Sequence, residues 1–536
     1  MAQSSDGRHG ATSPAAVGTA TRTSGKTAGA ADVVRDAAQH LPGVPALTAR
    51  LAPPRGRAAA DVLRRPEAVL RRAKQLPTAA VMLRDAMAPL LTGKVDDWRT
   101  EYAYTIGMQA FIYGFPYIYN AKLRHDWVTS ARDPAVIPYA PASHFWHASS
   151  LIDATYRDGG CPNNDTLYSV AWVDLSREPV ILSHPNMEDR YFTFELMAFT
   201  SDNFDYVGQR TTGRAAGHFA ITGPGWKGRL PAGVKKTQPS PTPWILVLGR
   251  TLVDGPEDLP NVRALQEQYK LTPLSKWGKP RARVPQRRNV YAPPDPQQDP
   301  LGPWKSLNAM LAENPPPAHH ALLLNQFARI GIGPRLDVEA QPEVVRRALI
   351  RAAAIGMPLL RQQFLGGDWA TVINGWRYPP PEEGRFGDDF LRRAADQSLA
   401  GITANDPAEA VYLLNFDDAS GRKLSPKGRY RLRFAASELP PVDAFWSLTA
   451  YAEEDMNLIP NAARRFSVGD RTPGLRREPD GGLTIYLQPK SPGSAREANW
   501  LPTSADRPWF VILRMYLPHR SVVQARWKCP GIVKVP

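Results

Sequence analysis

Residues 167–175 read LYSVAWVDL, a run dominated by β-branched and aromatic residues and bounded by Asn, Asp and Ser. Such a composition is typical of a strand. The same pattern returns in residues 191–199, YFTFELMAF, and in residues 244–253, WILVLGRTLV, with shorter runs at 180–182 and 218–222. Because turn residues separate these runs, they predict successive antiparallel strands and a β-rich domain.

A second series of strands is predicted toward the C-terminus. Its runs are residues 410–416, 430–434, 444–451, 483–488 and 509–516. Between the two series, residues 307–312, 318–330 and 342–364 carry apolar residues at helical spacing, and one more helix is expected within 376–405. The sequence therefore predicts an α+β fold with two β-rich regions and a helical segment between them. The C-terminal region is expected to be a sandwich or jelly roll.

Residues 103–121 form a run of 19 residues without a charged side chain. The run is long enough to span a membrane, but Gln109, Asn120 and four tyrosines make it too polar to face lipid. We therefore expect no membrane span here. A buried helix that ends near Pro116 explains the run better, because proline interrupts helical hydrogen bonding.

The N-terminal 95 residues differ in composition from the rest of the chain. Residues 1–45 are rich in Ala, Ser, Thr and Gly and are predicted to be a disordered tail. Residues 46–95 are predicted to be a basic helical extension, with either a solvated face or a docking or membrane-surface face. The rest is expected to divide into an N-terminal α+β domain at 96–255, a helical connection at 256–405 and a C-terminal β domain at 406–536.

The net charge of +15 raises nucleic acid as a possible partner. Residues 1–95 hold 14 Lys and Arg against 6 Asp and Glu, so more than half of that excess lies outside the predicted folded body. The body is only mildly basic. We therefore expect a small-molecule ligand and no nucleic acid as partner.

Two cysteines, Cys161 and Cys529, are too few for a disulfide framework and lack the spacing of a zinc motif. The pair His144-x-x-His147 could ligate a metal, but no third ligand stands at a convincing spacing, so no metal or other cofactor is predicted. Residues 1–30 lack the apolar segment of a secretory signal. The expected location is the cytoplasm, although the acid-poor, Arg-containing start also resembles an organelle transit peptide.

Several motifs resemble a known pair of domains. The N-terminal ones are NNDTLY at 163–168, DRYF at 189–192 and GPGWKG at 223–228, which are similar to the family called domain of unknown function 1254. The C-terminal ones are LPPVDAFWSLT at 439–449, SVGDRT at 467–472 and NWLP at 499–502, which resemble its usual partner, domain of unknown function 1214. The resemblance implies a multidomain α+β protein, frequently a homo-oligomer, and implies no reaction. The long basic N-terminal extension departs from the family pattern.

The cluster of Asn163, Asn164 and Asp165 is the first candidate for a binding site. Short polar side chains before a strand can cap a turn, and they can also face a ligand; both interpretations stay open. Tyr168 and Trp172 follow at strand spacing and could line the same polar site. Asp165 would then be a candidate general base.

Two charged residues stand inside apolar strands, and a third stands directly before one. Arg190 precedes the strand that contains Glu195, for which pairing with an arginine is the favoured interpretation and a raised pKa in a catalytic acid is the alternative. Arg514 lies in a strand that is apolar on both faces, so its charge needs a partner. That partner is either a structural carboxylate or an anionic ligand in a cleft between the domains.

No nucleophile elbow and no phosphate-binding loop occurs in the sequence. The leading functional hypothesis is an enzyme that hydrolyses or hydrates a small polar or carboxylate substrate by acid/base chemistry in an inter-domain cleft. Its catalytic residues would be Asp165 and Glu195. The alternative is a non-catalytic protein that binds a small ligand or is purely structural.

Overall fold

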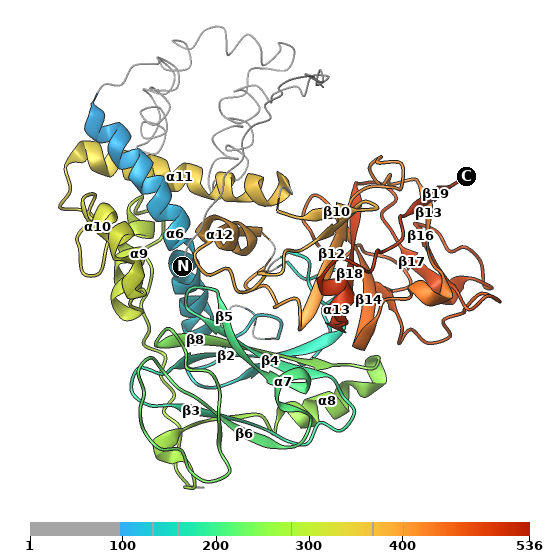
Figure 1. The fold of residues 1–536 in the computed structure, drawn as a ribbon, viewed down its shortest axis with the longest axis horizontal. Helices are drawn as coiled ribbons and strands as arrows, with labels where there is room; N and C mark the ends of the chain where they lie inside the picture. The colour runs from blue at the N-terminus through green and yellow to red at the C-terminus, as the bar shows by residue number, and fades with distance from the viewer. Residues whose placement is uncertain are drawn as a thin grey trace, which may run out of the picture. The chain divides into compact units, whose positions relative to one another are not determined.

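The computed structural model describes residues 97–130, 133, 135–157, 160–279, 281–366, 369–399 and 401–536. The predicted tail at 1–45 and the predicted basic extension at 46–95 lie outside the described residues. All described residues belong to one compact unit, in which a helical layer separates two β-rich domains along the chain (Figure 1).

The N-terminal β domain consists of two sheets packed face to face. In the first sheet all neighbouring strands are antiparallel, and their order is β1 (Trp146–His147), β2 (Thr166–Asp174), β8 (Trp244–Leu252), β4 (Phe192–Ala198) and β5 (Asn203–Gly208). The order in the second sheet is β7 (Lys235–Lys236), β6 (Gly217–Ile221), β3 (Val180–His184) and β9 (Lys270–Pro273). The short helices α7 (Gln209–Thr212) and α8 (Leu259–Gln266) connect strands.

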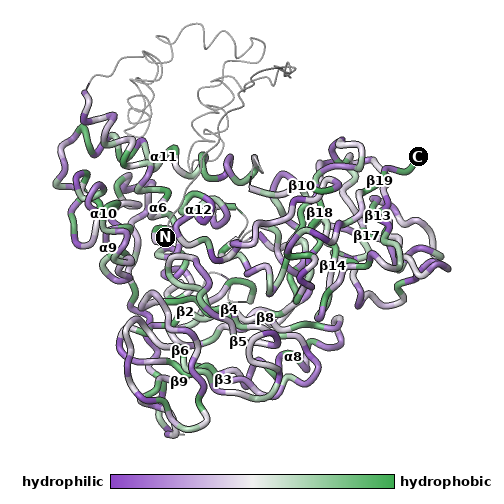
Figure 2. Tube along the Cα trace, viewed as in Figure 1, coloured by the Kyte–Doolittle hydropathy of each residue, from purple (hydrophilic) through white to green (hydrophobic). Residues whose placement is uncertain are grey.

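The first sheet is covered on both faces. In β2, Ala171 and Val173 pack toward the second sheet, whereas Val170 and Trp172 pack toward helices. Because successive side chains of a strand point to opposite faces, a strand covered on both faces needs an unbroken apolar run. Figure 2 shows such hydrophobic stretches along β4 and β8 in the middle of this sheet.

A group of helices shares one hydrophobic core with the face of the first sheet that is turned away from the second sheet. They are α6 (Trp98–Thr129), α9 (Gly302–Glu313), α10 (Ala321–Ala328), α11 (Glu343–Gly366) and α12 (Phe390–Leu399). The longest of them, α6, starts after Asp97, whose side chain accepts a hydrogen bond from the Arg99 amide at 2.9 Å. Such a cap satisfies a free amide at the helix start.

The prediction that this helix ends near Pro116 is wrong. Pro116 lies in the interior of α6, and Phe115, Pro116 and Tyr117 are all buried. Proline removes one helical hydrogen bond, but tertiary packing of the residues on both sides holds the helix together. No helix of the described residues is long and apolar enough to cross a membrane.

The C-terminal β domain is also built from two packed sheets. The first has the order β10 (Thr371–Ile373), β11 (Trp376–Tyr378), β12 (Ala410–Asn415), β18 (Trp509–Pro518), β14 (Val442–Ala452) and β15 (Ser467–Gly469). The second has the order β17 (Trp500–Pro502), β16 (Leu483–Gln488), β13 (Arg429–Phe434) and β19 (Val533–Val535). In β13, Tyr430, Leu432 and Phe434 are buried in the core between the sheets, and the arginines between them are exposed. The helix α13 (Arg520–Val523) follows β18.

The predicted α+β fold, with a helical segment between two β-rich regions, is confirmed. The jelly-roll topology of the second region stays a prediction.

Candidate functional site

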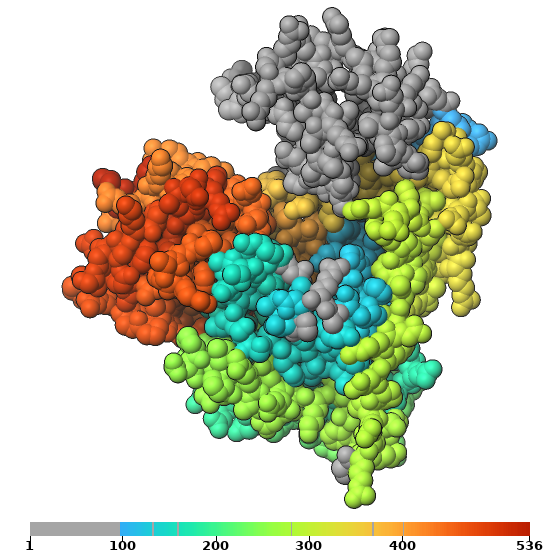
Figure 3. Space-filling view, turned by 180° about the vertical axis from the view of Figure 1, so that it is seen from behind, coloured from blue at the N-terminus to red at the C-terminus, as the bar shows by residue number. Residues whose placement is uncertain are grey.

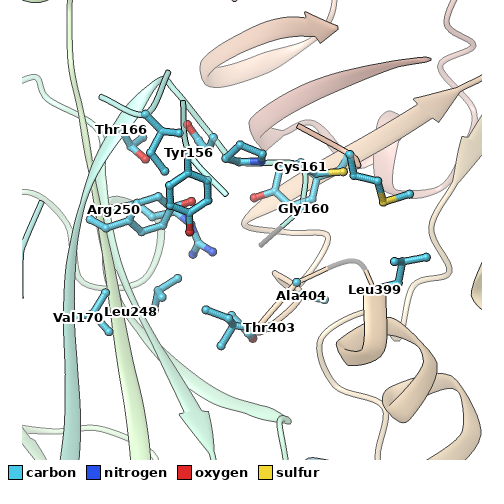
Figure 4. Close-up of a pocket in the computed structure, with 18 of the residues that line it drawn as sticks. Tyr156, Gly160, Cys161, Thr166, Val170, Leu248, Arg250, Leu399, Thr403 and Ala404 are labelled. Carbon is cyan, nitrogen blue, oxygen red and sulfur yellow. The ribbon is translucent and has the colours of Figure 1, made fainter. Parts of the chain in front are cut away.

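A cavity of about 970 Å³ lies where the two β domains and the helical layer meet. The N-terminal β domain contributes strands β2 and β8 and the segment before β2 to the walls. The helical layer contributes the end of α12 and the segment that follows it, and the C-terminal β domain contributes β12 and β18. Figure 4 shows lining residues from these walls. Val170 lies on β2, Leu248 and Arg250 lie on β8, and Gly160 and Cys161 precede β2. Leu399 ends α12, and Thr403 and Ala404 follow it.

Arg250 lies on β8 and lines the cavity, although only 5 % of it is exposed. Its Nη1 donates hydrogen bonds to Glu195 Oε2 at 2.6 Å and to Asn405 Oδ1 at 3.1 Å, while its Nε has no hydrogen-bond partner. Thr403 donates to the other oxygen of Glu195 at 2.7 Å. Burial raises the pKa of the Glu195 carboxyl, and Arg250 and Thr403 offset part of that rise. Glu195 thus lies behind Arg250 and does not line the cavity.

Arg514 lies on β18 and reaches the cavity from the C-terminal domain, with 4 % of the residue exposed. Its Nη2 donates to the carbonyl oxygen of Cys161 at 2.8 Å, and its Nη1 has no hydrogen-bond partner. The guanidinium carbon is 5.5 Å from the Tyr412 ring centre and 5.4 Å from that of Tyr451. Within the described part of the chain, no carboxylate forms an ion pair with Arg514. Arg514 is therefore a buried cation that lines the cavity and has one buried donor nitrogen without a hydrogen-bond partner.

Neutral polar groups lie beside the two arginines. The Asn405 amide donates to the Tyr412 hydroxyl at 2.6 Å, and both residues line the cavity. Tyr168 also lines it, with its ring centre 5.7 Å from the Arg250 guanidinium. Burial raises the pKa of Tyr412, so its hydroxyl stays protonated at neutral pH. Burial likewise raises the pKa of the Cys161 thiol to about 12, which makes that cavity-lining cysteine a poor nucleophile.

The Asn163–Asp165 cluster forms a turn and also contacts the C-terminal domain. The Asn163 side-chain oxygen accepts from the Asp165 amide at 2.6 Å, and the Asn163 amide group donates to the Tyr516 hydroxyl. Asp165 accepts from the Ser447 hydroxyl at 2.6 Å and lies 3.6 Å from Arg471. Of the three residues in this cluster, Asn163 lines the cavity and Asn164 and Asp165 do not. Figure 3 shows the segment leading to β2, in cyan, against the C-terminal domain in orange and red.

Two other predicted site residues lie elsewhere. Trp172 packs in the core beneath the helices, with its ring centre 5.7 Å from that of Phe199. Arg190 donates to both carboxylate oxygens of Asp258, at 2.5 and 2.9 Å, and to the Leu252 carbonyl oxygen. Of the residues predicted from the sequence, the structure therefore brings Asn163, Tyr168 and Arg514 to one cavity.

Four further residues line the cavity and were not predicted from the sequence: Arg250, Thr403, Asn405 and Tyr412. A signal for Arg250 was present, because it interrupts the apolar run of 244–253 in the same way as Arg514 interrupts that of 509–516. Thr403 and Asn405 lie in a segment without regular secondary structure, where residue spacing predicts no direction for a side chain.

Comparisons with known proteins agree with the motif resemblance. Residues 142–273 match the family described as protein of unknown function DUF1254, and residues 409–520 match the one described as protein of unknown function DUF1214. No curated protein matches the chain.

Two solved structures are similar to this chain. The VPA0106 protein from Vibrio parahaemolyticus, known from a crystal structure, shares 23% sequence identity with this chain, and the TM-score of the two structures is 0.62. The match covers 81% of this chain and 100% of the VPA0106 chain. An uncharacterised protein from Burkholderia cenocepacia is 16% identical, covers 89% of this chain and 99% of its own, and has a TM-score of 0.39. The first likeness concerns the fold alone. The chain thus pairs a DUF1254 domain with a DUF1214 domain, as the resemblance of its motifs predicted.

Proposed function

We propose that the protein binds a small molecule with a carboxylate group in the cavity between its two β domains. Arg514 is the principal anion-binding residue and Arg250 the second. The observation that carries the proposal is the state of Arg514: it lines the cavity, is buried, forms no ion pair with a described residue and has one buried guanidinium nitrogen without a hydrogen-bond partner.

Asp165 attracts Arg514 from a distance but forms no ion pair with it. A buried charge without an opposite charge in direct contact is costly, because it gives up its hydration. A ligand anion would provide that charge. The planar guanidinium fork matches the geometry of a carboxylate, with which it forms two parallel hydrogen bonds. Arg250 is already paired with Glu195 and its Nε is buried, so it would contribute mainly its electrostatic field.

The rest of the cavity fits a ligand with an apolar body. Its volume of about 970 Å³ lies at the upper end of the range of roughly 300 to 1,000 Å³ that is usual for small-molecule sites. Val170, Leu248 and Ile512 contribute apolar wall, while Asn405 and Tyr412 contribute hydrogen-bonding groups. A single acid group on an aliphatic or aromatic framework is therefore the expected ligand class.

Matched pairs of ligands test the proposal. Aliphatic and aromatic monocarboxylates, such as hexanoate and benzoate, are compared with their neutral amides by calorimetry on the full chain. We expect acids and not amides to bind, and Arg514→Met to weaken that binding by roughly 30-fold or more, about 2 kcal/mol. Arg431→Met is the control, because Arg431 lies exposed on β13 and outside the cavity. Equal binding of acids and amides would contradict the proposal.

One observation favours catalysis as a second candidate function. Glu383 lines the cavity, and its carboxylate and that of buried Asp396 lie 2.8 and 3.0 Å from the same nitrogen, Nη2 of Arg392. Burial first, and then the neighbouring Glu383, raise the pKa of Asp396 well above its ordinary value. A protonated carboxyl group beside a cavity could act as the general acid of the hydrolysis or hydration proposed from the sequence.

The two candidates differ in what happens to the bound acid. If the protein is an enzyme, NMR of carboxylates incubated with it will reveal a product, and Asp396→Asn will lower the turnover by about 100-fold while the ligand still binds. An unchanged spectrum for every carboxylate that binds leaves binding as the function. The expected cytoplasmic location and homo-oligomeric state stay predictions from the sequence.

A further inference from the structure

Three potential metal ligands meet in the helical layer, and none of them lines the cavity. Asp388 Oδ1 lies 2.9 Å from His320 Nε2 and 3.3 Å from His319 Nε2. One ligand atom from each of the three residues lies within 4.8 Å of the other two. His319 and His320 belong to a short 3-10 turn, Ala318–His320, and Asp388 precedes α12.

The separations match those of a coordination shell. Zinc bonds to histidine nitrogen and carboxylate oxygen are roughly 2.0 to 2.2 Å long, so tetrahedral geometry places neighbouring ligand atoms about 3.3 Å apart. The two measured distances from Asp388 Oδ1 are close to this value. The two distances from Asp388 Oδ1 would therefore change little if an ion were bound, and the two histidine ligand atoms lie within 4.8 Å of each other.

The surroundings of His320 fix its orientation. His320 is 7% exposed, and its Nδ1 lies 3.1 Å from the hydroxyl oxygen of Tyr113, a buried residue of α6. The Phe390 ring meets the imidazole edge-on, with 5.3 Å between the ring centres. A metal-binding histidine usually donates its other ring N–H to a hydrogen-bond acceptor, which fixes the tautomer. Tyr113 occupies that position and leaves Nε2 of His320 for a metal.

We propose that His319, His320 and Asp388 bind one divalent ion of the zinc class. Two imidazoles and a carboxylate suit zinc and the neighbouring borderline metals rather than calcium or magnesium, which prefer oxygen ligands alone. Side chains of His319 and Asp388 are 63% and 64% exposed. Three protein ligands at an exposed position leave a coordination place open to water or to a further ligand.

The simpler alternative is that Asp388 forms ion pairs with two protonated histidines. The chain has a matched example of such a pair, because His519 Nε2 lies 3.0 Å from Asp443 Oδ1 at an exposed position. His519 has only one carboxylate neighbour in the described part of the chain and no second histidine, so it cannot offer three ligands. It is therefore the control for this proposal.

The experiment measures Zn²⁺ binding to the untagged full chain by competition with a chromogenic chelator. Wild type should bind one more equivalent than the double variant His319→Ala/Asp388→Asn. Asp388→Asn alone and His319→Ala alone should weaken the site by about tenfold or more, as should Tyr113→Phe, which removes the hydroxyl beside His320. His519→Ala should bind like wild type.

Both substituted ligands are exposed, so melting temperatures without zinc should stay near that of wild type. A second measurement needs no variant: Co²⁺ added to wild-type protein should give the visible absorption of a four- or five-coordinate ion with nitrogen ligands. Equal zinc stoichiometry in wild type and the double variant would overturn the proposal. So would a Co²⁺ spectrum identical to that of the hydrated ion.

Discussion

At the scale of single residues, the two cavity arginines differ in what holds their charge. Arg250 is paired with Glu195 inside the protein, whereas Arg514 forms hydrogen bonds without an ion-pair partner among the described residues. Removing one partner of a buried ion pair leaves the other charge buried and uncompensated. Removing a buried charge that has no ion-pair partner instead removes its desolvation penalty from the folded state. The two residues should therefore respond in opposite ways to the same substitution.

We expect Arg250→Met to lower the free energy of unfolding by about 3 to 5 kcal/mol, because Glu195 would stay buried without its arginine. Arg514→Met should leave it unchanged or raise it. Urea unfolding of both variants at neutral pH checks the prediction. A comparable loss of stability in the two variants would mean that Arg514 has a structural partner of its own.

A second residue-scale prediction concerns His147, whose Nδ1 lies 2.8 Å from the Ser169 hydroxyl. Burial lowers the pKa of His147 to about 4, below its ordinary value of 6.5. Between these values the unfolded chain binds the proton more readily than the folded chain, so stability should fall as pH decreases from 6.5 toward 4. Between pH 7 and pH 5, partial exposure limits the loss to about 1 to 2 kcal/mol.

His147→Gln should remove this part of the acid sensitivity, since glutamine can still hydrogen-bond Ser169 but does not titrate. The measurement is the difference in unfolding free energy between pH 7 and pH 5 for wild type and the variant. The same loss in both proteins would assign the acid sensitivity to other groups, such as His184, whose pKa burial also lowers.

At the scale of elements, helices α6 and α11 approach so closely that a glycine is needed between them. A Cβ atom added at Gly356 of α11 would lie 2.2 Å from Cδ1 of Phe111 on α6. Gly356→Ala should therefore overpack the contact and lower stability by about 1 to 3 kcal/mol. Gly366 is the matched control on the same helix, because an added Cβ there meets no atom within 4 Å.

Gly366→Ala should leave stability unchanged or raise it by up to about 1 kcal/mol through helix propensity. Thermal unfolding of both variants distinguishes packing from propensity. A gain of stability in Gly356→Ala would show that the two helices can separate at no cost.

Local patterns predicted the long elements well and the short ones poorly. Apolar runs identified β2, β4, β8 and β18, since strands covered on both faces have no polar side to interrupt the run. Two-residue strands such as β1 and β7 carry no pattern of their own and form because a neighbouring strand offers hydrogen bonds. The continuation of α6 past Pro116 depends on packing, which residue spacing does not reveal.

The arginines of the candidate site were predictable from a charge inside an apolar strand, although the same signal also pointed to Glu195, which does not line the cavity. That signal identified Arg514 and, read consistently, would have identified Arg250. Asn163 was ambiguous because one side chain does two things: its oxygen closes a turn and its amide crosses to Tyr516 in the other domain. Only the tertiary fold brings residues 401–405 to the cavity.

At the scale of the whole molecule, hydrogen bonds and ion pairs join the two β domains. Glu409 of the C-terminal domain accepts from Tyr191 at 2.9 Å and from Arg210 at 2.7 Å, and Asp165 accepts from Ser447 at 2.6 Å. The pairing of Tyr451 with the Pro162 carbonyl oxygen adds a further contact at 2.7 Å. The contacts made by Tyr191, Ser447 and Tyr451 are buried, so neither domain can lose them without leaving polar groups that lack partners.

Asp165 tests the role of this junction. Asp165→Asn keeps an acceptor for Ser447 and should cost about 1 kcal/mol or less, whereas Asp165→Ala removes the acceptor and should cost about 1 to 3 kcal/mol. Because Asp165 does not line the cavity, both variants should bind carboxylates with the affinity of wild type once folded. Calorimetry together with urea unfolding checks both statements. A selective loss of ligand affinity in Asp165→Asn would return Asp165 to the functional site.

The shared walls of the cavity have a consequence for the gene itself. Arg250 comes from one family's domain and Arg514 from the other's, so two separately translated halves would each carry half of a binding site. When both halves belong to one polypeptide, they meet within one molecule instead of by collision of two molecules. The effective concentration of one half near the other is then higher than free subunits in a cell would usually reach. The proposed ligand site at this junction would therefore favour gene fusion even if the two halves fold independently.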